Sequence, residues 1–319
     1  MSRSSKRWRR ARQLLTLAFF ILVPMLVISL LRNLDWGEVH QALAAYRWQT
    51  LALAVLVSAC SFVLFSCFDL LGRRYTGHSL PARQVLPLAF VCYAFNLNLS
   101  AWVGAIALRY RLYSRLGLAL VTITRILGLG LVTNWLGYLC LAGALFASGL
   151  PRLPAGLDIG STGLHLIGLL LLVAALAYLL ACACARRRRW HLRGHEIILP
   201  SLPMAALQAL MGAGNWALMA LVMYSLLADK VDYPTILAVL LISSIAGVVT
   251  HIPAGLGVLE TVFLTLLHAS VGKGPLLAAL IAYRVVYFLL PLMVAGVLYL
   301  LLERVASQRT GASRSGSAG

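Results

Sequence analysis

Charged residues are scarce in this 319-residue chain, in which Asp, Glu, Lys and Arg together make up only 11%. Soluble globular domains carry about 25% charged residues, so this composition excludes an ordinary soluble protein. The six cysteines all lie within apolar segments. This placement favours small buried side chains over a disulfide framework or a metal cluster, and we expect neither a metal nor a cofactor.

Hydrophobic residues make up 61% of the chain, and they gather in long runs. A helix needs about 17 to 25 mostly apolar residues to cross a bilayer, and runs of this kind occupy 13–31, 49–71, 126–149, 162–185, 204–228 and 275–302. Two further runs, 85–107 and 235–272, are interrupted by polar residues, Gly and Pro. The alternation of a β-barrel is absent, so we expect an all-α polytopic membrane protein with about six full spans and two interrupted or re-entrant hairpins.

The basic residues indicate how these spans are oriented. If both interrupted runs begin and end on the same side, 21 basic residues lie on one side and 5 on the other. If 85–107 crosses once, the distribution becomes 12 against 14. The positive-inside rule favours the first arrangement, with a cytoplasmic basic N-terminus at 1–12, one membrane domain at 13–302 and a flexible cytoplasmic tail at 303–319. The net charge of +18 is thus explained without nucleic-acid binding.

The interrupted run 85–107 is too short to cross twice, so it predicts an element that enters the membrane from the cytoplasm and returns. It carries polar and small residues where a lipid-facing helix would have leucines: Asn96, Asn98, Ser100 and Gly104. Irregular backbone at membrane depth persists only where protein or water shelters it. We therefore expect a helix break at Gly104, with the polar side chains near a sheltered cavity.

The run 235–272 is interrupted at its middle by "HIPAGLGVLE". Pro253 removes a backbone donor, while Gly255 and Gly257 permit backbone angles that other residues avoid, so we expect the helix to break there. The run forms either two full tilted helices or two half-helices. His251 is either a packing residue at a helix end or a proton carrier. We expect Glu260 in the first turn of the second segment, where the helix N-terminus stabilises its charge.

The order helix, helix, interrupted run, helix occurs in 13–149 and again in 162–302, and the two halves begin on opposite sides. This pattern is typical of inverted-repeat transporters, in which broken helices form the substrate site near the midplane. Charges inside spans are costly, so Glu260 and Arg284 are expected to form a pair, with Arg109 nearby. Such a pair is either purely structural or part of a polar cavity. We expect Asp69 to form an ordinary i, i+4 pair with Arg73.

Three segments carry a family resemblance: "SAWVGAIALRYRLYSRLG", "SSIAGVVTHIPAGLGVLE" and "AYRVVYFLLP". They resemble the membrane domain that accompanies lysylphosphatidylglycerol synthases, a flippase-like family of inner-membrane proteins, over nearly the whole chain. The second segment matches the family's proline-glycine-glycine-glutamate pattern. The first departs from it, because Ser100 and Ala101 replace a proline and a glycine. The resemblance implies a bacterial inner-membrane protein that moves lipid between leaflets.

Three functions are compatible with these features. The first is a lipid translocase, in which the phosphate-bearing headgroup of an anionic phospholipid or glycolipid passes through a cavity lined by Arg109, Glu260 and Arg284. The second is a membrane-embedded lipid-modifying enzyme, although the chain has no H-E-x-x-H, G-x-S-x-G or P-loop signature. The third is a non-catalytic partner of a lipid synthase. We favour the translocase, and we expect no nucleic-acid partner.

Overall fold

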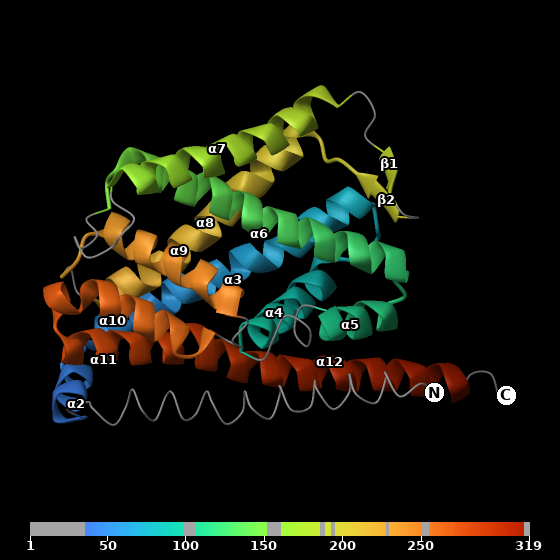
Figure 1. Ribbon diagram of the computed structural model, residues 1–319. Helices are drawn as coiled ribbons and strands as arrows, with labels where there is room; N and C mark the ends of the chain where they lie inside the picture. The colour runs from blue at the N-terminus through green and yellow to red at the C-terminus, as the bar shows by residue number, and fades with distance from the viewer. Residues whose placement is uncertain are drawn as a thin grey trace, which may run out of the picture.

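A computed structural model of the protein describes residues 36–98, 106–151, 161–185, 189–192, 195–227, 230–250 and 255–315. In chain order its elements are α2 (Trp36–Ala44), α3 (Trp48–Thr76), α4 (Ala82–Asn98), α5 (Arg109–Arg115), α6 (Leu120–Ser148), α7 (Ser161–Cys184), β1 (Arg189–Leu192), β2 (His195–Ile198), α8 (Leu202–Leu226), α9 (Tyr233–Thr250), α10 (Val258–Val271), α11 (Lys273–Tyr283), the π-helical turn η3 (Arg284–Leu289) and α12 (Leu290–Ser315). Figure 1 shows α7 along one edge of the bundle and α12 along the other, with α3, α6 and α8 between them.

Six helices in the described part of the chain are long and apolar enough to cross a membrane. Five of them correspond to predicted spans, namely α3, α6, α7, α8 and the continuous α11–η3–α12, and the sixth is α9. The predicted span 13–31 lies outside the described residues. The fold is therefore the expected all-α membrane architecture, with one small exception, the antiparallel hairpin of β1 and β2 between α7 and α8.

The centre of the bundle is the antiparallel pair α3 and α8. The Tyr46 hydroxyl, just before α3, donates a 2.7 Å hydrogen bond to the carbonyl oxygen of Leu226 at the end of α8. At the other end of the pair, the Tyr75 hydroxyl donates to the carbonyl oxygen of Ile198, just before α8. These two bonds show that α3 and α8 run in opposite directions.

Glycines bring α6 against both of its neighbours. A Cβ atom added at Gly137 of α6 would lie 2.1 Å from the backbone carbon of Gly212 of α8, and one added at Gly168 of α7 would lie 2.4 Å from the backbone nitrogen of Ala147. Inside a bilayer the hydrophobic effect does not drive helices together. Small residues that allow close backbone packing hold such helices together instead. The sequence thus forms a tight core of α3, α6, α7 and α8.

We call the two ends of this bundle the basic end and the opposite end. At the basic end α3 ends while α6 and α8 begin, and a Cβ atom added at Gly72 of α3 would lie 3.0 Å from the Ile126 side chain of α6. Most basic residues of the described loops and helix ends lie here, namely Arg73, Arg74, Arg83, Arg111, Arg115 and Arg125. At the opposite end α3 begins and α8 ends, and Figure 1 shows α2 there.

The first interrupted run is a re-entrant hairpin of α4 and α5 (Figure 1). α4 starts at the basic end directly after α3, and its 17 residues rise about 26 Å. Arg109, where α5 begins, pairs with Asp69 two turns before the end of α3. This pair shows that the chain has returned towards the basic end by Arg109. The expectation that 85–107 enters and returns is thereby confirmed. Ser100 and the predicted break at Gly104 lie outside the described residues.

The second interrupted run is a hairpin of α9 and α10 that enters from the opposite end. α9 has 18 residues, but α10 has 14 and rises only about 21 Å, less than the roughly 30 Å of a hydrocarbon core. The second helix of this hairpin is therefore too short for a full span, whereas α9 is long enough to cross. Gly255 and Gly257 at its tip have φ of 54° and 80°, as expected for a glycine break. His251 and Pro253 lie outside the described residues.

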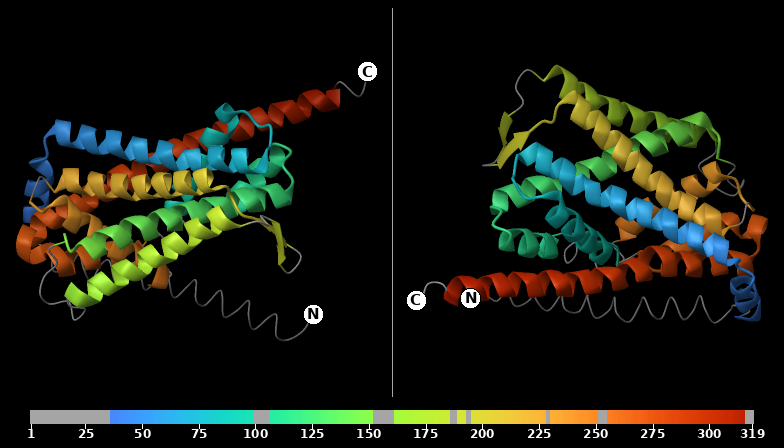
Figure 2. Two further views of the ribbon diagram at one scale, coloured as in Figure 1. Left: turned by 90° about the horizontal axis from the view of Figure 1, so that it is seen from above. Right: turned by 180° about the vertical axis from the view of Figure 1, so that it is seen from behind.

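Figure 2 shows the same bundle from above and from behind, with the C-terminal part of α12 extending past the other helices. The two hairpins therefore enter the core from opposite ends, and both reach α11–η3–α12, which runs along them.

Candidate functional site

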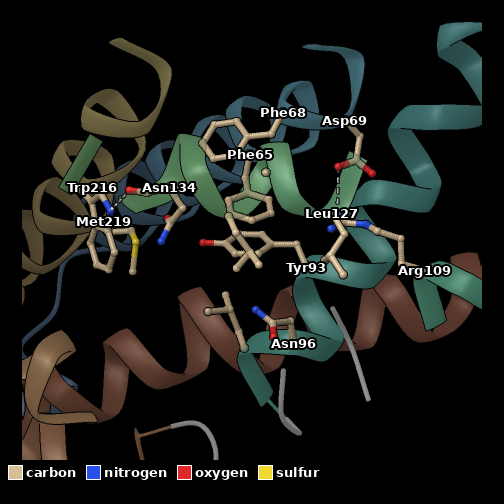
Figure 3. Close-up of a pocket in the computed structure, with 13 residues that line it drawn as sticks. Phe65, Phe68, Asp69, Tyr93, Asn96, Arg109, Leu127, Asn134, Trp216 and Met219 are labelled. Atoms are coloured by element: carbon tan, nitrogen blue, oxygen red, sulfur yellow. Dashed lines mark hydrogen bonds and ion pairs between the residues drawn. The ribbon is translucent and has the colours of Figure 1, made fainter. Parts of the chain in front are cut away.

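A cavity of about 160 Å³ lies within the bundle, between α3, α4, α5, α6 and α8. Figure 3 shows Asp69 and Arg109 at one end of the cavity, Phe65 and Tyr93 in its middle, and Asn134, Trp216 and Met219 at the other end. Asn96 of α4 also faces this space, as expected for a polar residue in the first interrupted run. The cavity thus combines an ion pair, amides and aromatic faces at membrane depth.

The ion pair at the end of this cavity is formed by Asp69 and Arg109. Arg109 Nη2 donates to Asp69 Oδ1 at 3.0 Å, and the Tyr113 hydroxyl donates to Asp69 Oδ2 at 2.8 Å. The side chains of Arg109 and Asp69 are only 6% and 1% exposed. The predicted partner of Asp69, Arg73, was therefore wrong, because α5 returns against the buried face of α3 and places a second guanidinium there.

Arg109 keeps one donor that the protein does not use. Its Nε is buried and has no hydrogen-bond partner within the described part of the chain. A buried donor without a partner costs about 1 to 3 kcal/mol, and a charged donor more. Arg109 also lines the cavity, so its guanidinium can offer donors to a ligand oxygen there. Arginine is well suited to bind phosphate and carboxylate oxygens in this way.

A second ion pair lies at the tip of the α9–α10 hairpin. Arg284 Nε donates to Glu260 Oε1 at 2.7 Å, and Arg284 Nη2 donates to Glu260 Oε2 at 3.2 Å and to the Gly255 carbonyl oxygen at 3.0 Å. The backbone N–H of Gly257 donates to Glu260 Oε2 at 2.9 Å. The expected contact is present, and Glu260 lies in the first turn of α10, where the helix N-terminus favours its charge.

The cavity that Arg109 lines does not have Glu260 or Arg284 among its described lining residues, although the sequence had suggested one cavity for all three. η3 runs alongside α3, where the Ser58 hydroxyl donates to the Val286 carbonyl oxygen at 3.3 Å. Arg284 is thus level with about the second or third turn of α3. Asp69 lies about 13 residues further along α3, a rise of about 20 Å. The geometry gives one charged position towards the basic end and another towards the opposite end.

η3 connects both hairpins. From the first hairpin, Asn98 Nδ2 donates to the carbonyl oxygen of Phe288 at 3.1 Å. From the second, Gly255 and Glu260 bind Arg284, whose guanidinium carbon lies 4.4 Å from the centre of the Phe288 ring. A π-helical turn leaves carbonyl groups outside the regular α-helical pattern, and such turns are frequent at functional sites. Asn98 therefore stabilises the contact between hairpin and turn and does not line the cavity.

A buried hydroxyl network joins this turn to the cavity. The Tyr287 hydroxyl of η3 lies 2.7 Å from Ser61 Oγ and 3.1 Å from the Tyr93 hydroxyl, and Ser61 Oγ donates to Asn215 Oδ1 at 2.8 Å. Tyr93 also lines the cavity, stacked on Phe65. Sequence reasoning missed the tyrosines of this network, because a tyrosine in an apolar run also fits lipid-facing or ordinary core positions.

The comparison with known proteins places this architecture in a family. The sequence profile described as the lysylphosphatidylglycerol synthase TM region matches residues 13–295, which include both hairpins and both ion pairs. The chain belongs to this family. It is 47% identical over 311 residues to the inner membrane protein YbhN of Escherichia coli (strain K12), covering 97% of each chain.

A more distant relative extends the same alignment. The chain is 28% identical over 317 residues to the uncharacterized protein slr0712 of Synechocystis sp., covering 93% of this chain and 96% of the relative.

In the described residues, no three His, Cys, Asp or Glu side chains lie together as a metal site would require. The chemistry available at the site is therefore that of two ion pairs, amides, hydroxyl groups and aromatic rings.

Proposed function

We propose that this membrane protein moves a phosphate-bearing lipid, an anionic phospholipid or glycolipid, between the leaflets of a bacterial inner membrane. The observation that carries this proposal is the cavity at membrane depth with the buried Asp69–Arg109 pair in its wall. Ionisable groups inside the membrane are costly and usually mark a transport path or a binding site. Membership of a family described by a lipid synthase's membrane region agrees with a lipid substrate.

The headgroup is the part of a lipid that resists crossing, because its charges lose hydration in the hydrocarbon core. In this proposal Arg109 replaces part of that hydration by donating to a phosphate oxygen, while Asn96 and Asn134 offer further polar contacts. The acyl chains stay in the bilayer. Arg284, held by Glu260 towards the opposite end of the bundle, is the second position that the phosphate reaches.

The opposed hairpins support the proposal that 13–149 and 162–302 are inverted-topology repeats, which would let the two halves open alternately to the two sides. The concentration of basic residues at the basic end supports a cytoplasmic placement of that end, together with both termini. In this orientation the Arg109 position is the cytoplasmic one. A lipid synthase is the natural class of partner, since it would supply the lipid that is moved.

A reconstitution experiment tests this function. The purified chain is placed in vesicles of phosphatidylethanolamine and phosphatidylglycerol that contain acyl-NBD-phosphatidylglycerol, and dithionite is added outside. Transport makes the inner-leaflet dye accessible to bleaching, so fluorescence falls below the level of protein-free vesicles. The proposal is wrong if NBD-labelled phosphatidylglycerol, phosphatidylethanolamine and a glycolipid all stay protected. Chemical change of the lipid would instead favour the enzyme, and neither change would favour a non-catalytic partner.

A further inference from the structure

Within the described part of the chain, the wall of the cavity between α4 and α6 lacks close helix–helix packing. Both helices line it, α4 through Tyr93, Asn96 and Leu97 and α6 through residues 127–134. Yet α6 packs its backbone closely on α3, α7 and α8, whereas α4 packs on α3 and α12. Within the described part of the chain, α4 and α6 are not close neighbours of each other. The wall between α4 and α6 is therefore made mainly of side chains.

Two adjacent residues of α6 form the weakest part of this wall. Leu131 lines the cavity and is also 53% exposed on the outer surface of the bundle. Gly130 lines the cavity too, and outside its own helix backbone and its chain neighbours no atom of the described residues lies within 4 Å of the place where its Cβ would be. Gly130 is ten residues from the start of α6 at the basic end, a rise of about 15 Å, so this part of the wall faces hydrocarbon and not water.

From these observations we infer that the α4–α6 wall at Gly130 and Leu131 is a lateral entrance through which a phospholipid reaches the cavity from within the leaflet. This inference rests on the proposed function and specifies its route. An occupant entering here must be amphiphilic, because the rim is apolar and faces lipid while the interior holds Arg109 and Asn96. The phosphate would accept from the Arg109 guanidinium, and the acyl chains would pass Leu131 into the bilayer.

The chain offers a matched pair of variants for testing the entrance. Gly130→Leu places a side chain in the wall of the cavity, where there is open space to hold it. Gly128→Leu places the same side chain on the same helix, also in open space, at a position that does not line the cavity. Both changes replace a helical glycine by a strong helix former, so neither should destabilise α6. Equal thermal unfolding of the two purified variants checks this.

Two readouts are combined on vesicles of phosphatidylethanolamine and phosphatidylglycerol. A phosphatidylglycerol with a diazirine near its acyl carbonyl is photolysed and its adducts are mapped by mass spectrometry, and acyl-NBD-phosphatidylglycerol reports transport. We expect the unmodified chain and Gly128→Leu to carry adducts at Leu131 and Leu97 and to move the dye. Gly130→Leu should lose both the adducts and the transport.

The outcomes separate the entrance from the function. Transport without adducts on α4 or α6, or a Gly130→Leu variant that matches Gly128→Leu in both readouts, would overturn the entrance and leave the proposed function intact. Adducts at Leu131 and Leu97 that Gly130→Leu abolishes, in a chain that moves no lipid, would support the entrance as a lipid site and refute transport.

Discussion

Substituting the Asp69–Arg109 pair should separate its structural role from its role in transport. The two side chains are 1% and 6% exposed, so little water screens either charge. Asp69→Asn leaves the Arg109 guanidinium buried without a counter-charge, and losing one partner of a buried pair costs about 3 to 5 kcal/mol. At about 1.4 kcal/mol per tenfold, the ratio of folded to unfolded protein should fall more than hundredfold. Combining Asp69→Asn with Arg109→Gln removes both charges. This double variant should recover much of the lost stability.

A conservative change at the same pair isolates the unused donor. Arg109→Lys keeps the positive charge beside Asp69 but has no Nε and cannot bind an oxygen with a planar fork. We expect this variant to retain most of its stability, because the ion pair persists, and to lose transport, because the cavity no longer offers a planar guanidinium. Asp69→Asn with Arg109→Gln should likewise be folded and inactive.

Stability is measured as the unfolding midpoint of detergent-purified protein, and transport as dithionite-accessible NBD-phosphatidylglycerol. The Glu260–Arg284 pair provides an internal comparison, because its side chains are 20% and 15% exposed and the cost of breaking it should be smaller. The reasoning is refuted if Asp69→Asn unfolds at the same temperature as the unmodified chain. An Arg109→Lys variant that is stable and fully active would show that the headgroup does not need the planar guanidinium of Arg109.

Three further predictions follow from the same geometry. Glu260→Gln and Arg284→Gln should each impair lipid movement, and the double variant should regain abundance without regaining transport; recovery of both would show that the pair is purely structural. Single cysteines at Ser79 and Ser114, in a cysteine-free background, should both resist an impermeant thiol reagent in intact cells, because both positions lie at the basic end. Labelling at position 114 alone would contradict the first hairpin. Gly137→Ala should sharply reduce the yield of folded protein, since its Cβ would lie 2.1 Å from the backbone of α8. Normal expression and a normal unfolding midpoint would instead show that the α6–α8 contact can relax.

The sequence was sufficient to predict the spans and the two hairpins. Hydrocarbon thickness sets the length of a spanning helix, and the positive-inside rule sets its direction, so apolar runs and basic residues together determine which segments must return. The pairing of Glu260 with Arg284 was also predictable. Few charges lie inside the spans, and an unpaired charge there is too costly to keep.

The sequence did not predict the partner of Asp69 or the separation of the two ion pairs. α3 is apolar on all sides, so no periodic pattern marks which of its faces is buried in protein and which meets lipid. Within one helix, Arg73 was the obvious partner at i, i+4. Only the return of α5 against α3 places Arg109 on the buried face, and only the alignment of η3 with α3 places Arg284 about 20 Å away. Both depend on contacts between segments far apart in the chain, and in a bilayer these contacts are set by close packing of small residues instead of by the hydrophobic pattern that a soluble protein displays.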